Sequence, residues 1–237
     1  MASQSIQETR IRRLNDHPSK KGSYVLYWMQ QSQRVEYNHA LEYAIEQANR
    51  LDQGVLVGFG LMDNYPEANL RHYTFMLEGL QETKTSLAQQ GIRMVIQYGS
   101  PPDVALSLGR KASLIVCDRG YLSHQKAWRS QVACSASCPV VQVESDVVVP
   151  VEVVSQKAEY AARTIRSKIH KYLNDYLVPL KSSGVKKSSL GLKIDSLDLK
   201  DIGTVLKNLC IDRSISPVTQ FFKGSSGGLS GRTNRSP

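Results

Sequence analysis

Short apolar runs alternate along the chain with longer stretches in which apolar residues are spaced three and four apart. An unbroken apolar run of about four to eight residues is typical of a strand buried on both faces of a sheet. The sequence predicts five such strands, at residues 24–29, 54–59, 93–98, 113–117 and 140–143.

The stretches between these strands carry helical periodicity. Strands that alternate with helices predict a parallel sheet covered on both faces, and right-handed crossovers favour a doubly wound arrangement. We therefore predict an α/β fold with a doubly wound, Rossmann-like, five-stranded parallel sheet in the order 3-2-1-4-5. Ligands of such sheets bind beyond the carboxyl ends of the strands where the order reverses, here between "WMQQSQR" (28–34) and "CDRGY" (117–121).

The pattern changes after Pro150. Residues 155–180 predict a helix with a broad apolar stripe, and residues 181–193, "KSSGVKKSSLGLK", have the composition of a linker. A short helix is expected within residues 199–209. The last residues, 223–237, show no periodicity and are predicted to be disordered.

The net charge of +9 is distributed unevenly. Residues 22–156 hold 10 Lys and Arg against 13 Asp and Glu, whereas residues 1–21, 157–171 and 223–237 are net basic. The basic segments suit contacts with nucleic-acid phosphates, and they equally suit solvated tails and an exposed helix face. Both interpretations stay open, but the central region lacks the charge of a DNA-binding surface.

Several familiar kinds of site are absent from the sequence. No GxGxxG follows the first strand, and there is neither a Walker phosphate loop nor a nucleophile elbow. No histidines stand at metal-ligand spacing, and Cys134 and Cys138 have no second pair with which to bind zinc. Because no secretory signal or membrane span is visible, we expect a cytoplasmic protein with reduced thiols. The residues alone therefore predict a binding crevice without a catalytic or metal-binding group.

Four motifs in order add a further signal: "YWMQQSQRVEYNHAL" (27–41), "NLRHYTFMLEGLQE" (69–82), "SQKAEYAARTIRSKI" (155–169) and "DRSISPVTQFFKG" (212–224). Each resembles a segment of class II cyclobutane pyrimidine dimer photolyases, and the similarity runs from about residue 10 to residue 224. The resemblance implies an N-terminal α/β domain that holds an antenna chromophore, either a deazaflavin or a folate. It also implies a C-terminal helical domain with FAD, which flips the dimer out of UV-damaged DNA and donates the electron that splits it.

The resemblance also sets the expected domain organisation. We assign residues 1–21 to a basic arm, 22–156 to the antenna domain, 157–222 to a connecting helix, linker and start of the helical domain, and 223–237 to a tail unrelated to the family. We expect the chain to be truncated before the FAD domain and not to catalyse repair by itself. The helix stripe that truncation would expose predicts self-association.

The strand ends supply the candidate chromophore-binding residues. They are Trp28, Met29, Gln30, Arg34, Asn38, Phe59, Asp118 and Arg119. Arg34 and Arg119 are favoured because a charged group at a strand end is rarely needed for packing, whereas Trp28 equally suits a core. Two alternatives stay open, a non-enzymatic nucleotide-binding α/β module and a remnant without function. The photolyase-like segment after Ser155 favours the photolyase interpretation.

Overall fold

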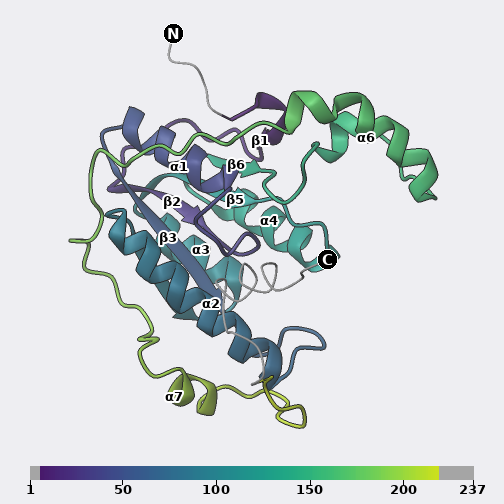
Figure 1. Ribbon diagram of the computed structural model, residues 1–237. Coiled ribbons are helices and arrows are strands. Elements are labelled where there is room, and N and C mark those ends of the chain that lie inside the picture. Colours follow the sequence, from purple (N-terminus) through teal and green to yellow (C-terminus); the bar gives the residue numbers. More distant parts are fainter. Residues whose placement is uncertain (1–5, 219–237) are drawn as a thin grey trace.

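The five predicted runs form five neighbouring strands of a six-stranded sheet (Figure 1). The computed structural model describes residues 6–218, so the predicted disorder of residues 223–237 lies outside the described residues. The order β1-β6-β5-β2-β3-β4 joins β1 (Ile11–Arg13), β2 (Tyr24–Trp28), β3 (Gly54–Leu61), β4 (Arg93–Tyr98), β5 (Ala112–Asp118) and β6 (Val140–Val143). Strands β2 to β6 are parallel and stand in the predicted order, which confirms the doubly wound α/β fold.

Helices cover both faces of this sheet (Figure 1). The described helices are the 3-10 helix η1 (Glu8–Arg10) and the α-helices α1 (His39–Arg50), α2 (Leu70–Gln89), α3 (Pro101–Gly109), α4 (Ser123–Ser135), α5 (Val151–Val154), α6 (Ala162–Tyr176) and α7 (Ile202–Lys207). Residues of α1, α2 and the α7 region share one core with one face of the sheet, and those of α3 and α4 share a second core with the other face. No described helix is long and apolar enough to cross a membrane.

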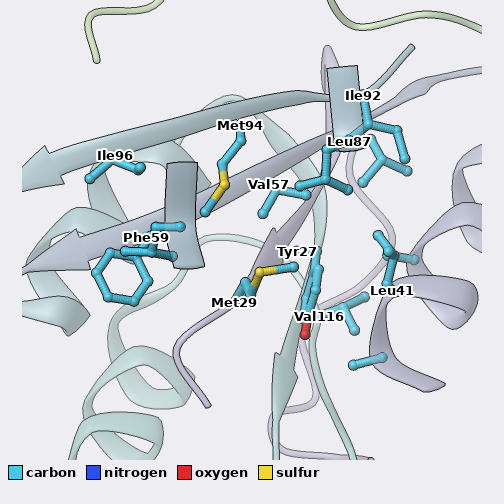
Figure 2. Close-up of a cluster of buried hydrophobic side chains, with 14 of the residues drawn as sticks. Tyr27, Met29, Leu41, Val57, Phe59, Leu87, Ile92, Met94, Ile96 and Val116 are labelled. Carbon is cyan, nitrogen blue, oxygen red and sulfur yellow. The ribbon is translucent and has the colours of Figure 1, made fainter. Parts of the chain in front are cut away.

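Successive residues of β2 alternate between these two cores. Tyr27 and Met29 pack in the first core, with Phe59 of the next strand (Figure 2), and Trp28 packs in the second. Since side chains of a strand alternate between the faces, a sheet covered on both sides buries all of them. Every residue of β2 is indeed buried, which explains the unbroken apolar run.

The sixth strand corrects the predicted five-stranded sheet. β1 lies in the segment predicted to be a basic arm, and it pairs antiparallel with β6, with Ile11 opposite Val143. The neighbouring Arg10 is buried, and its guanidinium donates hydrogen bonds to the main-chain oxygens of Glu144 (3.1 Å) and Val147 (2.9 Å). A strand of three residues, two of them arginine, carries no periodicity, so its pattern could not reveal it.

The predicted linker, residues 181–193, is held against the sheet domain. Ser189 is buried, and its hydroxyl donates to the main-chain oxygen of Val55 (2.5 Å) and accepts from the main-chain N–H of Arg93 (2.7 Å). Farther along the chain, the main-chain N–H of Leu197 donates to the main-chain oxygen of Ile96 in β4. This segment satisfies strand groups that would otherwise lack partners and covers the edge strand β4. Composition alone does not reveal such a role for serine.

The helix predicted at residues 155–180 is shorter, since α6 spans 15 residues. It lies beside β1 at the edge of the molecule and extends beyond the sheet (Figure 1). Its last residue, Tyr176, forms a hydrogen bond of 2.9 Å with the hydroxyl of Thr9, and the Arg10 guanidinium lies 5.5 Å from the centre of its ring.

The apolar stripe of this helix is only partly covered. No residue of α6 is fully buried, and the flanking Tyr160 and Leu177 are 89% and 65% exposed. Self-association through this stripe stays a prediction.

Candidate functional site

A cavity of about 490 Å³ opens at the carboxyl ends of β2 and β3. Its walls come from the loop after β2, the end of β3, the loop into α2, and the first turns of α2 and α4. Its rings and amides belong to Phe59, Tyr65, His72, Tyr73 and Trp128, and to Gln30, Gln31, Gln33 and Gln125. The volume lies within the ~300–1,000 Å³ that is usual for ligand pockets.

Three aromatic side chains fasten one side of this cavity. The Tyr65 ring meets His124 edge-on at 5.1 Å between centroids, and the Tyr65 hydroxyl forms a hydrogen bond of 3.0 Å with His124 Nε2. His124 in turn lies 4.9 Å from Trp128, one turn farther along α4. The main-chain N–H of Tyr65 donates to the Tyr73 hydroxyl at 3.4 Å. The loop before α2 is therefore fixed to both α4 and α2.

Glutamine amides line another part of the cavity in fixed positions. Gln30 donates to the main-chain oxygen of Gly60 (3.1 Å) and accepts from its N–H (3.2 Å) and from Trp28 Nε1 (3.2 Å). A Cβ at Gly60 would lie 2.7 Å from the Cα of Pro101, so only glycine fits where β3 meets α3. These bonds hold the end of β3 and the loop after β2 together at the cavity.

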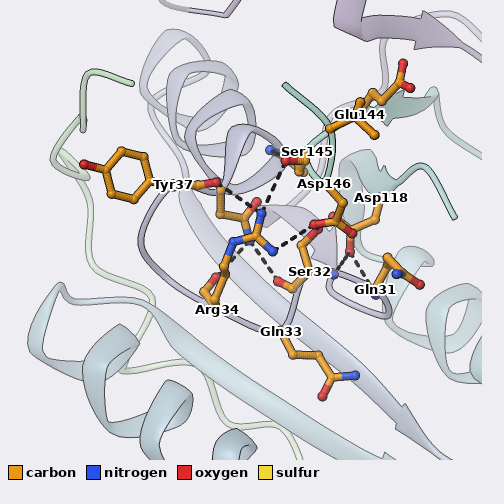
Figure 3. Close-up of polar contacts among 12 residues, drawn as sticks. Gln31, Ser32, Gln33, Arg34, Tyr37, Asp118, Glu144, Ser145 and Asp146 are labelled. Atoms are coloured by element: carbon orange, nitrogen blue, oxygen red, sulfur yellow. Dashed lines mark hydrogen bonds and ion pairs between the residues drawn. The ribbon is translucent and has the colours of Figure 1, made fainter. Parts of the chain in front are cut away.

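Asp118, at the end of β5, also holds the loop after β2. Its carboxylate accepts hydrogen bonds from the main-chain N–H groups of Gln31 and Ser32 (3.0 Å each) and from the Tyr27 hydroxyl (2.8 Å). Figure 3 shows the two main-chain bonds. Burial raises the pKa of Asp118, and the hydrogen bonds that it accepts act in the opposite direction. Asp118 thus shapes the cavity loop.

Arg34 belongs to a polar network behind this loop and does not line the cavity. Its guanidinium pairs with Asp146 at 2.8 Å, and the Ser32 hydroxyl donates to the same carboxylate at 2.9 Å (Figure 3). Asn38 is buried as the N-cap of α1, where it accepts from the main-chain N–H of Leu41 at 2.9 Å. Arg34 is therefore paired with Asp146 outside the cavity, and Asn38 holds the start of α1.

Arg119 is likewise held by carboxylates outside the cavity. It pairs with Glu144 at 3.1 Å and with Glu152 at 2.7 Å, and it lies 5.7 Å from the ring centre of Tyr121. The Tyr121 hydroxyl also donates to Glu144, which is buried. Burial, and then this carboxylate, raise the pKa of Tyr121.

The structure therefore places the predicted site residues in different surroundings. Gln30 and Phe59 line the cavity, whereas Met29 is buried in the first core. The expected crevice between β2 and β5 is almost filled, with about 20 Å³ left among side chains that include Trp28, Asp118 and Arg129. Large side chains thus occupy the switch point between β2 and β5. The 490 Å³ cavity lies instead above the carboxyl end of β3, the strand on the other side of β2.

The residues on the far side of the cavity were not predicted from the sequence. Tyr65 lies in the loop after β3 and Trp128 lies in α4, and neither belongs to a recognisable motif. One signal was available, since His124 and Trp128 are four residues apart and share a face of a predicted helix. Their link to Tyr65 arises only in the folded protein.

The charge of the cavity lining is low. None of its residues is Lys or Arg, and Glu67 is its one carboxylate. His72 accepts a hydrogen bond from the main-chain N–H of Asn69 at 3.2 Å as part of the cap of α2. The lining therefore suits an uncharged planar ring, which can stack on aromatic side chains and meet amide groups at its edge.

Comparison with known proteins identifies the family. The sequence matches the DNA photolyase family over residues 25–185. The chain belongs to the DNA photolyase family. The deoxyribodipyrimidine photo-lyase of Methanothermobacter thermautotrophicus is 47% identical over 196 residues, which cover 82% of this chain and 42% of that protein. The corresponding protein of Potorous tridactylus is 31% identical over 94% of this chain and 42% of its own length.

Solved photolyase structures share the fold of this family member. An archaeal photolyase from Sulfolobus tokodaii superposes with a TM-score of 0.67 at 15% identity, over 90% of this chain and 46% of that protein. A class III photolyase from Agrobacterium tumefaciens gives a TM-score of 0.63 at 17% identity, over 90% and 44%. The chain spans about two fifths of the length of the relatives that it matches in sequence.

Proposed function

We propose that residues 22–156 are the antenna domain of a class II cyclobutane pyrimidine dimer photolyase, and that the cavity above β3 holds its light-harvesting chromophore. One observation carries the proposal: a preformed, aromatic and amide-lined cavity lies at the carboxyl ends of parallel strands in a member of this family. A light-harvesting role needs a fixed chromophore and no catalytic group from the protein. The cavity meets both conditions, because its lining side chains are held by hydrogen bonds and ring contacts and include no predicted catalytic group.

The lining favours one class of chromophore. A folate carries a glutamate tail, and a cavity without Lys or Arg offers that anion no partner. A flavin-like tricyclic ring can stack against Trp128 and Tyr65, while the amides of Gln31 and Gln125 meet its polar edge. We therefore assign the cavity to a deazaflavin or flavin ring in preference to a folate. The Sulfolobus tokodaii photolyase was solved with two FAD molecules and implicates a novel light-harvesting cofactor.

Repair itself is proposed for the whole photolyase. In that proposal FAD supplies the electron that splits the dimer in UV-damaged DNA. FAD is held by a part of the photolyase other than residues 6–218. The antenna domain contributes by holding a chromophore in a fixed position. The assignment to class II rests on the four sequence motifs.

Equilibrium titration tests the chromophore proposal. The 237-residue chain is titrated with a deazaflavin and separately with a reduced folate, following chromophore absorbance and fluorescence anisotropy. We expect saturable one-to-one binding of the deazaflavin and at least about tenfold weaker binding of the folate, a difference of ~1.4 kcal/mol. Absence of saturable binding by either molecule would contradict the proposal, and tighter binding of the folate would overturn the assignment of ring class.

A further inference from the structure

We propose that the exposed face of α6 binds the phosphate backbone of DNA. This inference rests on the proposed function in one respect: the polyanion that a photolyase encounters is DNA. The exposed face is defined here as Arg163, Arg166, Ser167, His170, Lys171 and Asn174, all of which are exposed.

The charge of this segment differs from that of the sheet domain. Residues 157–176 hold five Lys and Arg against two Asp and Glu, whereas residues 22–156 are net acidic. Lys168 is neutralised by Glu159 at 2.6 Å. Within residues 6–218, no ion pair involves Arg163, Arg166 or Lys171. Three cations of the exposed face are therefore available to an anionic partner.

The spacing of these cations matches a nucleic-acid strand. Arg163 and Lys171 are eight residues apart, so they are separated by about 12 Å along a helix that rises ~1.5 Å per residue. Phosphates of one DNA strand follow one another every ~3.4 Å along the duplex axis, so this length covers three to four of them. Ser167, His170 and Asn174 lie between and beyond the cations and are side chains that commonly bond to phosphate oxygens.

The opposite side of α6 holds this face in its orientation. Ile165, Ile169 and Leu173 are half-buried, and Tyr176 is fixed by Thr9 at 2.9 Å and lies beneath the Arg10 guanidinium. The end of α6 is thus attached to the body of the protein through Tyr176, and the exposed face remains accessible on a helix that extends beyond the sheet (Figure 1).

The chemistry of the exposed face favours DNA over a protein partner. Stable protein interfaces contain buried apolar or aromatic anchors surrounded by a polar rim. The exposed face has polar and basic side chains at all six positions and no such anchor. Contacts with phosphates need only positive charge and hydrogen-bond donors, which are the groups that this face presents.

Binding of an undamaged 20-base-pair duplex, measured by fluorescence anisotropy at several salt concentrations, tests this inference. The test variant carries Arg163→Gln, Arg166→Gln and Lys171→Gln, and the control carries Arg50→Gln, Arg110→Gln and Lys111→Gln, which removes the same charge at exposed positions elsewhere. Gln has a helix propensity close to that of Arg and Lys, and circular dichroism checks the fold of both variants.

We expect the chain to bind the duplex with an affinity that falls steeply with salt. The test variant should lower the slope of log Kd against log salt by roughly 2–3, because each phosphate contact contributes ~0.9, and the control should keep the wild-type slope. Equal weakening of both variants, or no binding by the wild-type chain, would overturn the inference. So would equally tight binding of a polyglutamate peptide, which would indicate an acidic protein partner. The deazaflavin titration of the same variants reports on the chromophore proposal separately, since α6 does not line the cavity.

Discussion

The carboxylate of Asp118, at the end of β5, accepts a 3.0 Å hydrogen bond from the main-chain N–H of Ser32, in the loop after β2. The same oxygen accepts from the N–H of Gln31, the next residue toward β2. A side chain at one strand end thereby replaces the main-chain partners that the loop lacks. The three glutamines that this loop contributes to the cavity depend on that anchor for their position.

Replacement of Asp118 tests this anchor. Asp118→Ala should lower the free energy of unfolding by roughly 2–4 kcal/mol, since it leaves buried donors without an acceptor. It should also weaken chromophore binding, because the loop loses its fixed shape. Asp118→Asn keeps an acceptor oxygen and is the matched control, expected to retain most of the stability. Chemical denaturation and the deazaflavin titration measure both effects, and an alanine variant with wild-type affinity would show that the anchor does not shape the site.

Ser189 tests whether the segment after α6 is part of the folded domain. Ser189→Ala removes the hydroxyl between Val55 and Arg93 and leaves two main-chain groups without partners, so we expect a loss of roughly 2–4 kcal/mol. Ser188→Ala is the control, because that hydroxyl is exposed and water can replace it. Slow tryptic cleavage after Lys186 and Lys187 in the wild-type chain, faster in the Ser189 variant, is the second expected result. Rapid cleavage of both proteins would restore the interpretation as a free linker.

His39 should make the protein less stable in mild acid. Burial, and then Arg10 and Arg34, lower the pKa of His39 to about 4, and its Nδ1 is buried without a hydrogen-bond partner among the described residues. Between the ordinary pKa near 6.5 and about 4, the unfolded chain binds a proton that the folded protein does not, so stability falls as the pH falls.

The melting temperature measured between pH 7 and pH 4 checks this sign. His39→Gln should flatten the decrease over that window, whereas His17→Gln, at an exposed position, should not. An unchanged pH dependence in the His39 variant would mean that other groups cause the acid sensitivity.

The chain alone is not expected to repair DNA. The proposal assigns the electron transfer to FAD and places FAD in a part of photolyases outside the matched two fifths of the relatives. Irradiated DNA incubated with the 237-residue chain, reduced FAD and blue light should keep its dimers, with a full-length photolyase as the positive control. Light-dependent loss of dimers would contradict the proposal that repair needs a part of the photolyase outside this chain.

The sheet was predictable from the sequence, because strands buried on both faces must be apolar along their whole length. The predicted order of β2 to β6 is therefore correct, whereas β1 was missed. β1 is a strand only because β6 offers it a partner and because Arg10 is buried beside it. Ser189 was missed for a similar reason, since a buried serine within a polar stretch has no distinctive local pattern.

The candidate site was predictable only where it follows the strand ends. Gln30 and Phe59, two of the predicted residues, line the cavity, but Tyr65 and Trp128 are brought there by a loop and a helix. Arg34 and Arg119 were favoured because a charged group at a strand end is rarely needed for packing. Their partners, Asp146 and Glu144, are more than 20 residues distant in sequence and could not be paired with them in advance.

Trp128 offers the most direct test of the central claim, that the cavity above β3 holds the chromophore. The deazaflavin titration is repeated with Trp128→Ala and with the double variant Arg34→Ala, Arg119→Ala, after thermal melting has shown that both are folded. We expect at least about tenfold weaker binding for Trp128→Ala, which loses an aromatic stacking contact and its apolar surface, and little change for the double variant. Unchanged binding by Trp128→Ala together with loss of binding by the double variant would contradict a chromophore above β3 and move it to the arginines.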